Sequence, residues 1–266
     1  MKVFISADIE GTAGINFWDE ARRHVPGEYS QIQSLMTEEV IAACEGAREA
    51  GAEEVLIKDA HATGRNIILE RLPEYARIIR NWSGHPDAMM FGLSEDYDAA
   101  IYTGYHSKAG TETNPLAHTS NLRIYRVLLN GEVASEFTLN ALCAARYDVP
   151  SVFLSGDQGI CQDAQAFVHG IATVETLIGV GPSTNSIAPR KSRSEIRSGI
   201  AAVLAKDTSA MLPPIAPSFE LIIEFNNPED AYKASWYPGA KSHSPRTIAF
   251  EHKHFFEILR AYHFMK

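Results

Sequence analysis

The run Val3-Phe4-Ile5-Ser6-Ala7 is short and apolar, which predicts a buried β-strand. The segment from Glu28 to Ala50 repeats apolar residues at helical spacing, and a second apolar run follows from Val55 to Ile57. Strand, helix and strand in this order form a βαβ unit, whose two strands are parallel. The stretch therefore predicts an α/β fold with a mostly parallel, doubly wound sheet.

The same alternation continues along the chain. Further strands are predicted at residues 76–79, 99–103, 152–154, 221–225 and 247–250, and further helices at 135–147 and 194–205. Residues 123–129 are expected to be extended and to end in Asn130-Gly131, a dipeptide typical of hairpin turns. Leu212-Pro213-Pro214-Ile215-Ala216-Pro217 cannot continue a helix. We therefore predict a larger α/β domain over residues 1–208 and a smaller C-terminal β-α-β-α domain over residues 209–266.

Composition narrows the class of protein. Apolar residues make up 45% of the 266 residues and charged residues 21%, values close to those of ordinary folded domains. The formal net charge of −9 leaves no basic face for phosphates, so neither nucleic acid nor a membrane is an expected partner. The cysteines are three, Cys44, Cys143 and Cys161, and none forms a CxxC pair, so we expect buried thiols. The N-terminus lacks the long apolar core of a signal peptide, and we predict a cytoplasmic protein.

Acidic and imidazole side chains follow three of the predicted strands. The first strand leads into Asp8-Ile9-Glu10-Gly11, the second into Asp59-Ala60-His61, and the strand at 99–103 into Gly104-Tyr105-His106. Ligands of open parallel sheets bind beyond the carboxyl ends of the strands, so these side chains are expected at one edge. Asp8 and Glu10 share a side only if the strand ends near Asp8, which the glycines that follow favour. Gly104 beside the exit suggests close approach of a ligand.

Oxygen and nitrogen donors without thiolates suit zinc, manganese or similar divalent ions, and several carboxylates with two or more histidines suit a pair of metals. Asp8 is placed to bridge the pair. Each motif alone has a plainer interpretation, as a solvated loop or a helix cap. Asp59 is a candidate to orient a ligand histidine, and Asp157 is expected to cap a helix.

His118 lies in a loop away from any apolar stripe and is a candidate general acid, base or oxyanion partner. The other histidines lack placement at a strand exit and are expected to be surface or packing residues; they are His24, His85, His169, His243, His252, His254 and His263. No P-loop, GxGxxG, HExxH or GxSxG string occurs, which argues against nucleotide binding and serine catalysis.

Taken in order, these motifs resemble those of the dipeptide-operon D-aminopeptidases, bacterial binuclear zinc metallopeptidases that assemble into decamers. The resemblance covers nearly the whole chain and includes Glu136 with Leu139-Asn140-Ala141. It implies two Zn²⁺ ions per subunit bridged by Asp8, with Glu10 and His61 at one ion and His106 and Glu136 at the other. His118 matches the catalytic histidine of the family. Glu132, four residues earlier, is the rival of Glu136. The register against Leu139-Asn140-Ala141 favours Glu136, although Ser135 stands where the family has glycine.

The resemblance implies a metal-dependent aminopeptidase that removes N-terminal, D-type amino acids from short peptides or amino-acid amides, within a homo-oligomer. Lys58 and Thr12-Ala13-Gly14 depart from the family pattern and leave specificity open. A binuclear phosphoesterase or another amidohydrolase is the alternative enzyme class, although only Arg65 is seen near the expected rim. A non-catalytic small-molecule binder with metal-free histidines is the alternative outside enzymes.

Overall fold

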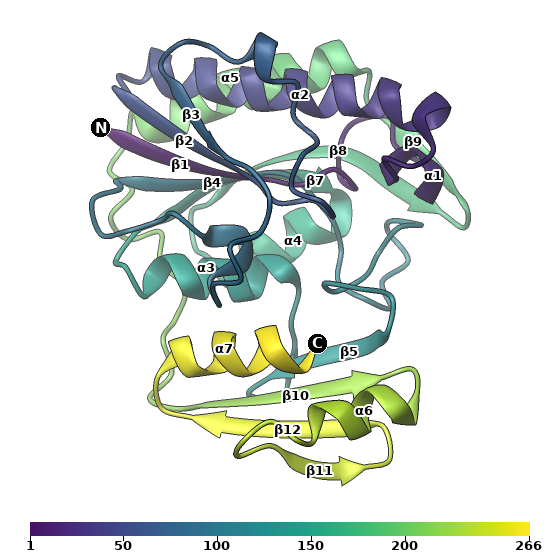
Figure 1. Cartoon of the computed structure of the whole chain (residues 1–266). Helices are drawn as coiled ribbons and strands as arrows, with labels where there is room; N and C mark the ends of the chain where they lie inside the picture. Colours follow the sequence, from purple (N-terminus) through teal and green to yellow (C-terminus); the bar gives the residue numbers. More distant parts are fainter.

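The computed structural model describes residues 1–266, which form two sheets with helices packed against them (Figure 1). The larger sheet has seven strands, which lie side by side in the order β3 (Ala76–Ile79), β2 (Glu54–Asp59), β1 (Lys2–Ala7), β4 (Ala99–Tyr105), β7 (Ser151–Asp157), β8 (Ala172–Val180) and β9 (Ser183–Ser186). All neighbours are parallel except β8 and β9. The order reverses between β1 and β4, and in such sheets that switch point is the usual ligand crevice.

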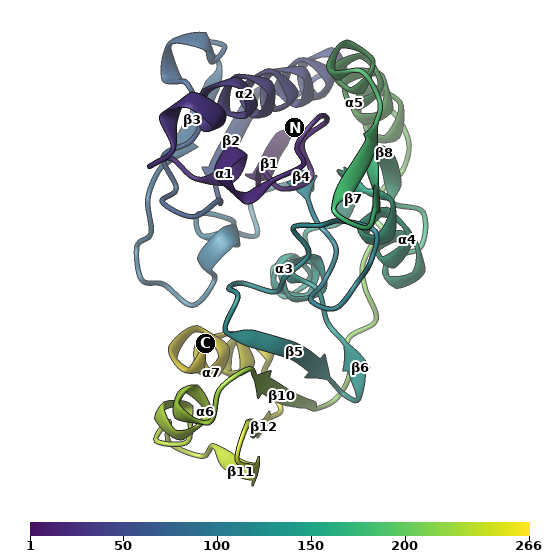
Figure 2. The same ribbon diagram turned by 90° about the vertical axis from the view of Figure 1, so that its right-hand side faces the viewer.

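Helices cover both faces of this sheet, as a doubly wound fold requires. The first face carries α2 (Pro26–Glu49) and α5 (Pro189–Leu204), which Figure 2 shows side by side. The opposite face carries α3 (Glu136–Ala145) and α4 (Gln158–Phe167). Two apolar cores result, one on each side of the sheet. The α/β class and the mostly parallel sheet predicted from the sequence are therefore confirmed.

The smaller sheet is antiparallel and draws strands from two distant parts of the chain. Its order is β11 (Lys241–Ser244), β12 (Thr247–His252), β10 (Phe219–Phe225), β5 (Ile124–Leu129) and β6 (Glu132–Val133). Two helices accompany it, α6 (Pro228–Ala234) and α7 (Phe255–Met265). The hairpin predicted around Asn130-Gly131 is present, but it pairs with β10 and so belongs to the second sheet. The division at residue 208 stays a prediction, with the qualification that residues 209–266 do not complete this sheet alone.

Several elements were not predicted, namely β8, β9, β11 and the short helix α1 (Trp18–Ala21). The apolar residues of α7 mostly point inward, since Phe255, Ile258, Leu259 and Tyr262 are buried. Three large aromatic side chains near the smaller sheet are exposed, namely Tyr232, Trp236 and Phe264, the last of them on α7. None of the helices combines the length and apolar character that a membrane crossing requires.

Glu39 is a buried carboxyl group that connects three parts of the larger unit. It lies on α2, and its Oε1 accepts hydrogen bonds from the main-chain N–H of Ala13 at 3.1 Å and from Ser192 Oγ of α5 at 2.7 Å. Its Oε2 has no partner. Burial raises the pKa of Glu39 from its ordinary 4.5 to about 7, against the opposing effects of these two bonds and of Arg193.

A raised pKa in the folded state makes stability fall as pH rises, because the unfolded chain ionises first. Between pH 4.5 and pH 7 the folded protein holds the Glu39 proton that the unfolded chain has lost. We expect Glu39→Gln, which keeps the acceptor Oε1, to gain about 3 kcal/mol of unfolding free energy relative to the unchanged protein between pH 4.5 and pH 8. Urea denaturation across this range measures the difference. Glu38→Gln is the control on the same helix; a pH-independent difference for Glu39→Gln would show that Glu39 is ionised when folded.

Candidate metal centre and its cavity

Two glycines bring the ends of β1 and β4 into direct backbone contact. The N–H of Gly11 donates to the carbonyl of Gly104 at 2.8 Å. A Cβ on Gly11 would lie 1.8 Å from the Tyr105 carbonyl oxygen, and one on Gly104, whose φ is +66°, would lie 2.2 Å from the Asp8 carbonyl oxygen. Gly104 therefore marks close approach of another strand exit, and not of a ligand as the sequence analysis expected.

Asp8 and Glu10 converge on His61, as predicted for a strand that ends near Asp8. Strand β1 ends at Ala7, and the chain turns at once. His61 Nδ1 lies 3.3 Å from Asp8 Oδ1 and 3.1 Å from Glu10 Oε2. All three side chains are at most 8% exposed. The exits of β1 and β2 thus supply one half of a buried cluster.

His106, Glu136 and His118 form the other half of the cluster. His106 Nε2 lies 3.6 Å from Asp8 Oδ2 and 3.5 Å from Glu136 Oε1. His118 Nε2 lies 3.7 Å from the same Glu136 oxygen, and its ring stacks on His106 with centroids 4.2 Å apart. Asp8 touches both histidines and so stands between the two halves. Glu136 begins α3, whereas its rival Glu132 is exposed on β6.

All three imidazoles are oriented by main-chain carbonyls. Each places one ring nitrogen within hydrogen-bond distance of an oxygen that can only accept, so that nitrogen carries the proton. The oxygens belong to Ala21 for His61, Ser107 for His106 and Leu116 for His118, at 2.8, 3.0 and 2.9 Å. The other nitrogen of each ring, unprotonated in the neutral form, faces the carboxylates. Metal-binding histidines are held in this way in proteins generally.

Electrostatics in the cluster are dominated by three buried carboxyl groups. Burial, assisted by the nearby Glu10 charge, raises the pKa of Asp8 to about 8. Burial also opposes ionisation of Glu10 and Glu136, but the imidazoles outweigh it. His61 holds the pKa of Glu10 well below its usual range, and His106 holds that of Glu136 at about 2. The carboxylates in turn raise the pKa of His61 and His106 despite burial.

The donor atoms fit a divalent cation. Ligand atoms of Asp8, Glu10 and His106 lie within 4.8 Å of one another, and so do those of His106, His118 and Glu136. Glu10 Oε2 is buried and has no hydrogen-bond partner, although an unsatisfied carboxylate oxygen is costly. A cation would satisfy it, and oxygen and imidazole donors without thiolate are suited to zinc. His118 therefore has ligand geometry too, which the sequence analysis did not anticipate.

Asp59 organises the loop that carries His61 but does not contact the imidazole. Its carboxylate accepts from the N–H groups of Asn66 and Ile67 and from Asn66 Nδ2, at 2.5, 2.9 and 2.7 Å. Asn66 Nδ2 also donates to the His61 carbonyl at 2.7 Å. The expected hydrogen bond from a ligand histidine to Asp59 is absent, because His61 donates to a carbonyl on α1 instead.

Asp157 holds the loop beyond β4 and caps α4. It accepts from the N–H of Ile160 at 3.1 Å, which confirms the predicted helix cap. Its oxygens also accept from the N–H of Ser107 at 2.7 Å, from Ser107 Oγ, and from Asn114 Nδ2 at 3.0 Å. Asn114 Nδ2 in turn donates to the Glu10 carbonyl at 3.0 Å. One buried carboxylate therefore fixes the residue beside His106 and connects it to Glu10.

Asp157→Asn should destabilise the protein, because an NH₂ group would replace one acceptor that faces buried N–H donors. We expect a loss of about 2–4 kcal/mol in unfolding free energy, measured as a shift of the urea midpoint. Asp96→Asn, at an exposed position with no hydrogen-bond partner, is the control and should change stability by less than about 0.5 kcal/mol. Equal stability of the two variants would show that the donors around Asp157 find other acceptors.

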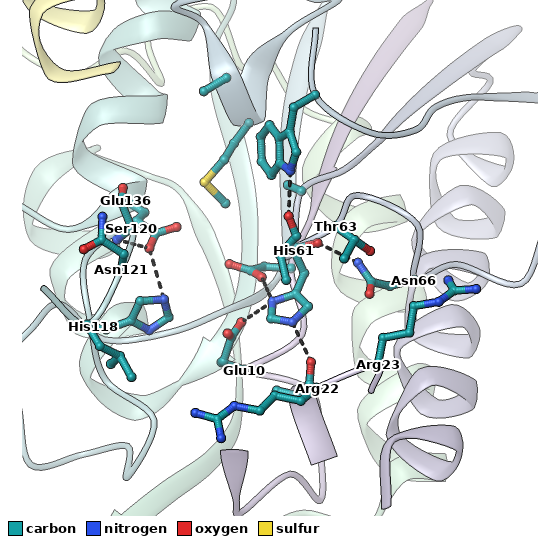
Figure 3. Close-up of a pocket in the computed structure, with 18 of the residues that line it drawn as sticks. Glu10, Arg22, Arg23, His61, Thr63, Asn66, His118, Ser120, Asn121 and Glu136 are labelled. Atoms are coloured by element: carbon teal, nitrogen blue, oxygen red, sulfur yellow. Dashed lines mark hydrogen bonds and ion pairs between the residues drawn. The ribbon is translucent and has the colours of Figure 1, made fainter. Parts of the chain in front are cut away.

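The cluster opens into a cavity of 760 Å³. Figure 3 shows His118, Ser120, Asn121 and Glu136 on one side of it and Glu10, His61, Asn66, Arg22 and Arg23 on the other. Aromatic and apolar side chains complete the wall, namely Trp18, Trp82, Met89 and Leu122.

Two arginines line this cavity, contrary to the expectation that only Arg65 lies near the rim. Arg22 pairs with Asp19 at 3.6 Å, and Arg23 donates to the Arg65 carbonyl. The sequence analysis disfavoured a phosphoesterase because it found no other arginine near the site. The presence of Arg22 and Arg23 removes that argument. Arg22 and Arg23 lie in the irregular segment between α1 and α2. That segment has no periodic pattern from which their position could have been predicted.

The structure also shows where His24, His263 and Lys58 lie relative to the cavity wall. His24 and His263 line the cavity, and neither joins the cluster. Lys58 is fully buried, donates to the carbonyls of Asp59 and Asn81, and lies 4.2 Å from the ring centre of Trp82. Burial lowers the pKa of Lys58 to about 8. Lys58, which departs from the family pattern, thus packs against Trp82, a residue of the cavity wall.

Fold and site together define an α/β protein with a carboxylate and imidazole cluster of metal-binding type at the switch point of its parallel sheet. Comparison with known proteins makes this specific. Residues 1–264 match the model of the D-aminopeptidase family. A D-aminopeptidase of Bacillus subtilis is 28% identical over 98% of this chain and 95% of its own length.

A solved structure agrees over the whole chain. The zinc-dependent D-aminopeptidase DppA of Bacillus subtilis, described as a self-compartmentalizing protease, superposes with a TM-score of 0.92 at 26% identity, covering 100% of this chain and 96% of its own. The chain therefore belongs to the D-aminopeptidase family. The resemblance noted in the sequence and the peptidase class it implied are confirmed.

Proposed function

We propose that this protein is a zinc-dependent aminopeptidase that hydrolyses N-terminal, D-type amino acids from short peptides or amino-acid amides. One observation carries the proposal: three imidazoles, each fixed by a main-chain carbonyl, aim their second nitrogen at three buried carboxylates that line one cavity. The names of its relatives, a D-aminopeptidase and a zinc-dependent D-aminopeptidase, support the substrate and the metal.

We assign two Zn²⁺ ions to each subunit. Asp8 would bridge them, because its two oxygens face His61 and His106 separately. Glu10 and His61 would complete one site, and His106 and Glu136 the other. Zinc, when bound, polarises a peptide carbonyl and lowers the pKa of a water molecule.

His118 is the proposed catalytic residue. Its Nδ1–H is committed to the Leu116 carbonyl, so Nε2 is free to take a proton from the attacking water and deliver it to the leaving nitrogen. Trp18 packs edge-on against the His118 ring at 5.3 Å and shields it from bulk water. As the C–N bond breaks, the departing amine thus leaves with the proton that the water lost.

The proposal also covers the oligomeric state of the protein and its location in the cell. We infer a homo-oligomer, a decamer by resemblance, which the self-compartmentalizing character of the structural relative supports. Tyr232 on α6 and Trp236, just beyond the end of that helix, are 65% and 73% exposed and offer apolar surface for such contacts. We place the protein in the cytoplasm, with short peptides as its partners and neither nucleic acid nor membrane.

Metal analysis of four variants tests the assigned roles. We expect Asp8→Asn to lose both zinc ions, because it weakens the one shared ligand, and Glu136→Gln to lose metal in part. His118→Ala should keep both ions and lose about 10²–10⁴-fold in turnover. Glu132→Gln, on the exposed rival, is the matched control and should retain metal and activity. Loss of zinc from His118→Ala would make that histidine a ligand and refute its separate role.

A substrate panel tests the reaction. Chelator-treated protein should lose hydrolysis of D-alaninamide and recover it when zinc is restored, whereas L-alaninamide should react more slowly. p-Nitrophenyl phosphate is included because Arg22 and Arg23 line the cavity. Faster hydrolysis of the phosphate ester than of every amide would favour the phosphoesterase alternative. Failure of zinc to restore amidase activity would refute the proposal.

A further inference from the structure

A lysine ammonium group lies in the cavity without a carboxylate partner. Lys266 follows α7 and lines the same cavity as the cluster. Its Nζ lies 3.4 Å from Ser120 Oγ and 5.1 Å from the ring centre of Tyr262. Glu136, a carboxylate in its vicinity, pairs with His106 and His118 instead. Burial lowers the pKa of Lys266, because a buried ammonium group loses part of its solvation by water.

Ser120 connects this ammonium group to the candidate metal centre. Its N–H donates to Glu136 Oε1 at 2.6 Å, while its Oγ accepts from Tyr262 Oη at 2.8 Å and from Lys266. The hydroxyl therefore receives two donors and keeps its own proton for another acceptor. Ser120 has a φ of +65°, a left-handed conformation that is rare outside glycine and concentrates at functional sites.

Asn121 adds a third donor beside these two. Its Oδ1 accepts from the N–H of Arg123 at 3.0 Å, which leaves the Nδ2 group without a partner. Asn121 lines the cavity next to Ser120 (Figure 3). An ammonium, a hydroxyl proton and an amide NH₂ thus share one wall, and an anion that can accept several hydrogen bonds fits them best.

The two arginines of the cavity, Arg22 and Arg23, lie on the side away from Ser120 and Asn121 (Figure 3). Arg22 pairs with Asp19 and lies over the Trp18 ring, and Arg23 donates to the Arg65 carbonyl. Lys266 is therefore the cation that lies beside the Ser120 hydroxyl. One serine and two hydrogen bonds link Lys266 Nζ to Glu136 Oε1, so the two atoms are at most about 10 Å apart, no more than the length of an extended peptide of three residues.

We propose that Lys266, together with the Ser120 hydroxyl and the Asn121 amide, binds the α-carboxylate of a short peptide whose N-terminal residue lies at the carboxylate and imidazole cluster. The inference rests on the proposed aminopeptidase function and adds its specificity: substrates with a free carboxylate, one or two residues beyond the scissile bond, are selected over the corresponding amides. Lys266 acts in substrate positioning and not in bond cleavage.

Two probes that differ only in the terminal group test this site. D-alanylglycine carries the carboxylate, and D-alanylglycinamide replaces it with a neutral amide. Their binding is measured by calorimetry in the zinc-loaded His118→Ala background. We expect Lys266→Met to shift the ratio of the two dissociation constants by about 10- to 100-fold toward the amide, the effect of one charge-assisted hydrogen bond. Lys253→Met, at an exposed lysine, is the matched control and should leave the ratio unchanged.

Kinetics on the otherwise unchanged chain give the second readout. Lys266→Met should lower kcat/KM for the dipeptide by the same factor through KM, while the value for the amide changes by less than about 3-fold. Lys266→Arg should restore part of the loss, and circular dichroism checks that each variant is folded. An equal loss for both probes, or no loss for either, would overturn the carboxylate site.

The two proposals fail in different ways. If the dipeptide binds with the Lys266-dependent preference but neither probe is hydrolysed by the unchanged protein, the aminopeptidase function is wrong and the carboxylate site stands. If both probes are hydrolysed and the ratio is insensitive to Lys266→Met, the function stands and the carboxylate site is wrong.

Discussion

The backbone contact between Gly11 and Gly104 is the constraint on which the site depends. It holds the exits of β1 and β4 together at the switch point, so Asp8 and His106 approach within 3.6 Å. Any side chain on Gly11 would collide with the main chain of β4, where no rotamer change relieves the overlap. The cluster is therefore positioned by the sheet itself, and the loops beyond it only orient what the strands deliver.

The cluster buries several ionisable groups side by side, which costs free energy of folding. Three carboxyl groups are buried together, and their repulsion is relieved in part by two imidazoles whose pKa values rise. Main-chain carbonyls take one nitrogen of each ring and leave the other directed inward. Burial, orientation and an unsatisfied Glu10 oxygen all point to one remedy, a divalent cation, in agreement with the zinc dependence of the structural relative.

The residues that follow the ends of the strands could be predicted from the sequence, because an apolar run and the residues after it form a local pattern. Asp8, Glu10, His61 and His106 could be placed at one edge for that reason. Glu136 and His118 could not, since one begins a helix on the far side of the hairpin and the other lies in a loop without periodicity. His118 was a candidate catalytic group from the sequence, and the family resemblance gave Glu136 its role; the structure shows that the two converge. The pairing of β5 with β10 was likewise hidden, because 90 residues separate strands that meet only in three dimensions.

The smaller unit reaches the site through α7, which explains why its contribution was invisible in the sequence. The helix packs against α3, and its Tyr262 donates to Ser120, whose N–H holds Glu136. The residue that fixes a candidate metal ligand is thus itself fixed by the C-terminal helix. Residues 1–208 supply the carboxylates, the imidazoles, Ser120 and Asn121, and the C-terminal helix and the residue after it supply Tyr262 and Lys266. A peptide carries an amine at one end and a carboxylate at the other, which matches the carboxylate cluster and the Lys266 ammonium group in the same cavity.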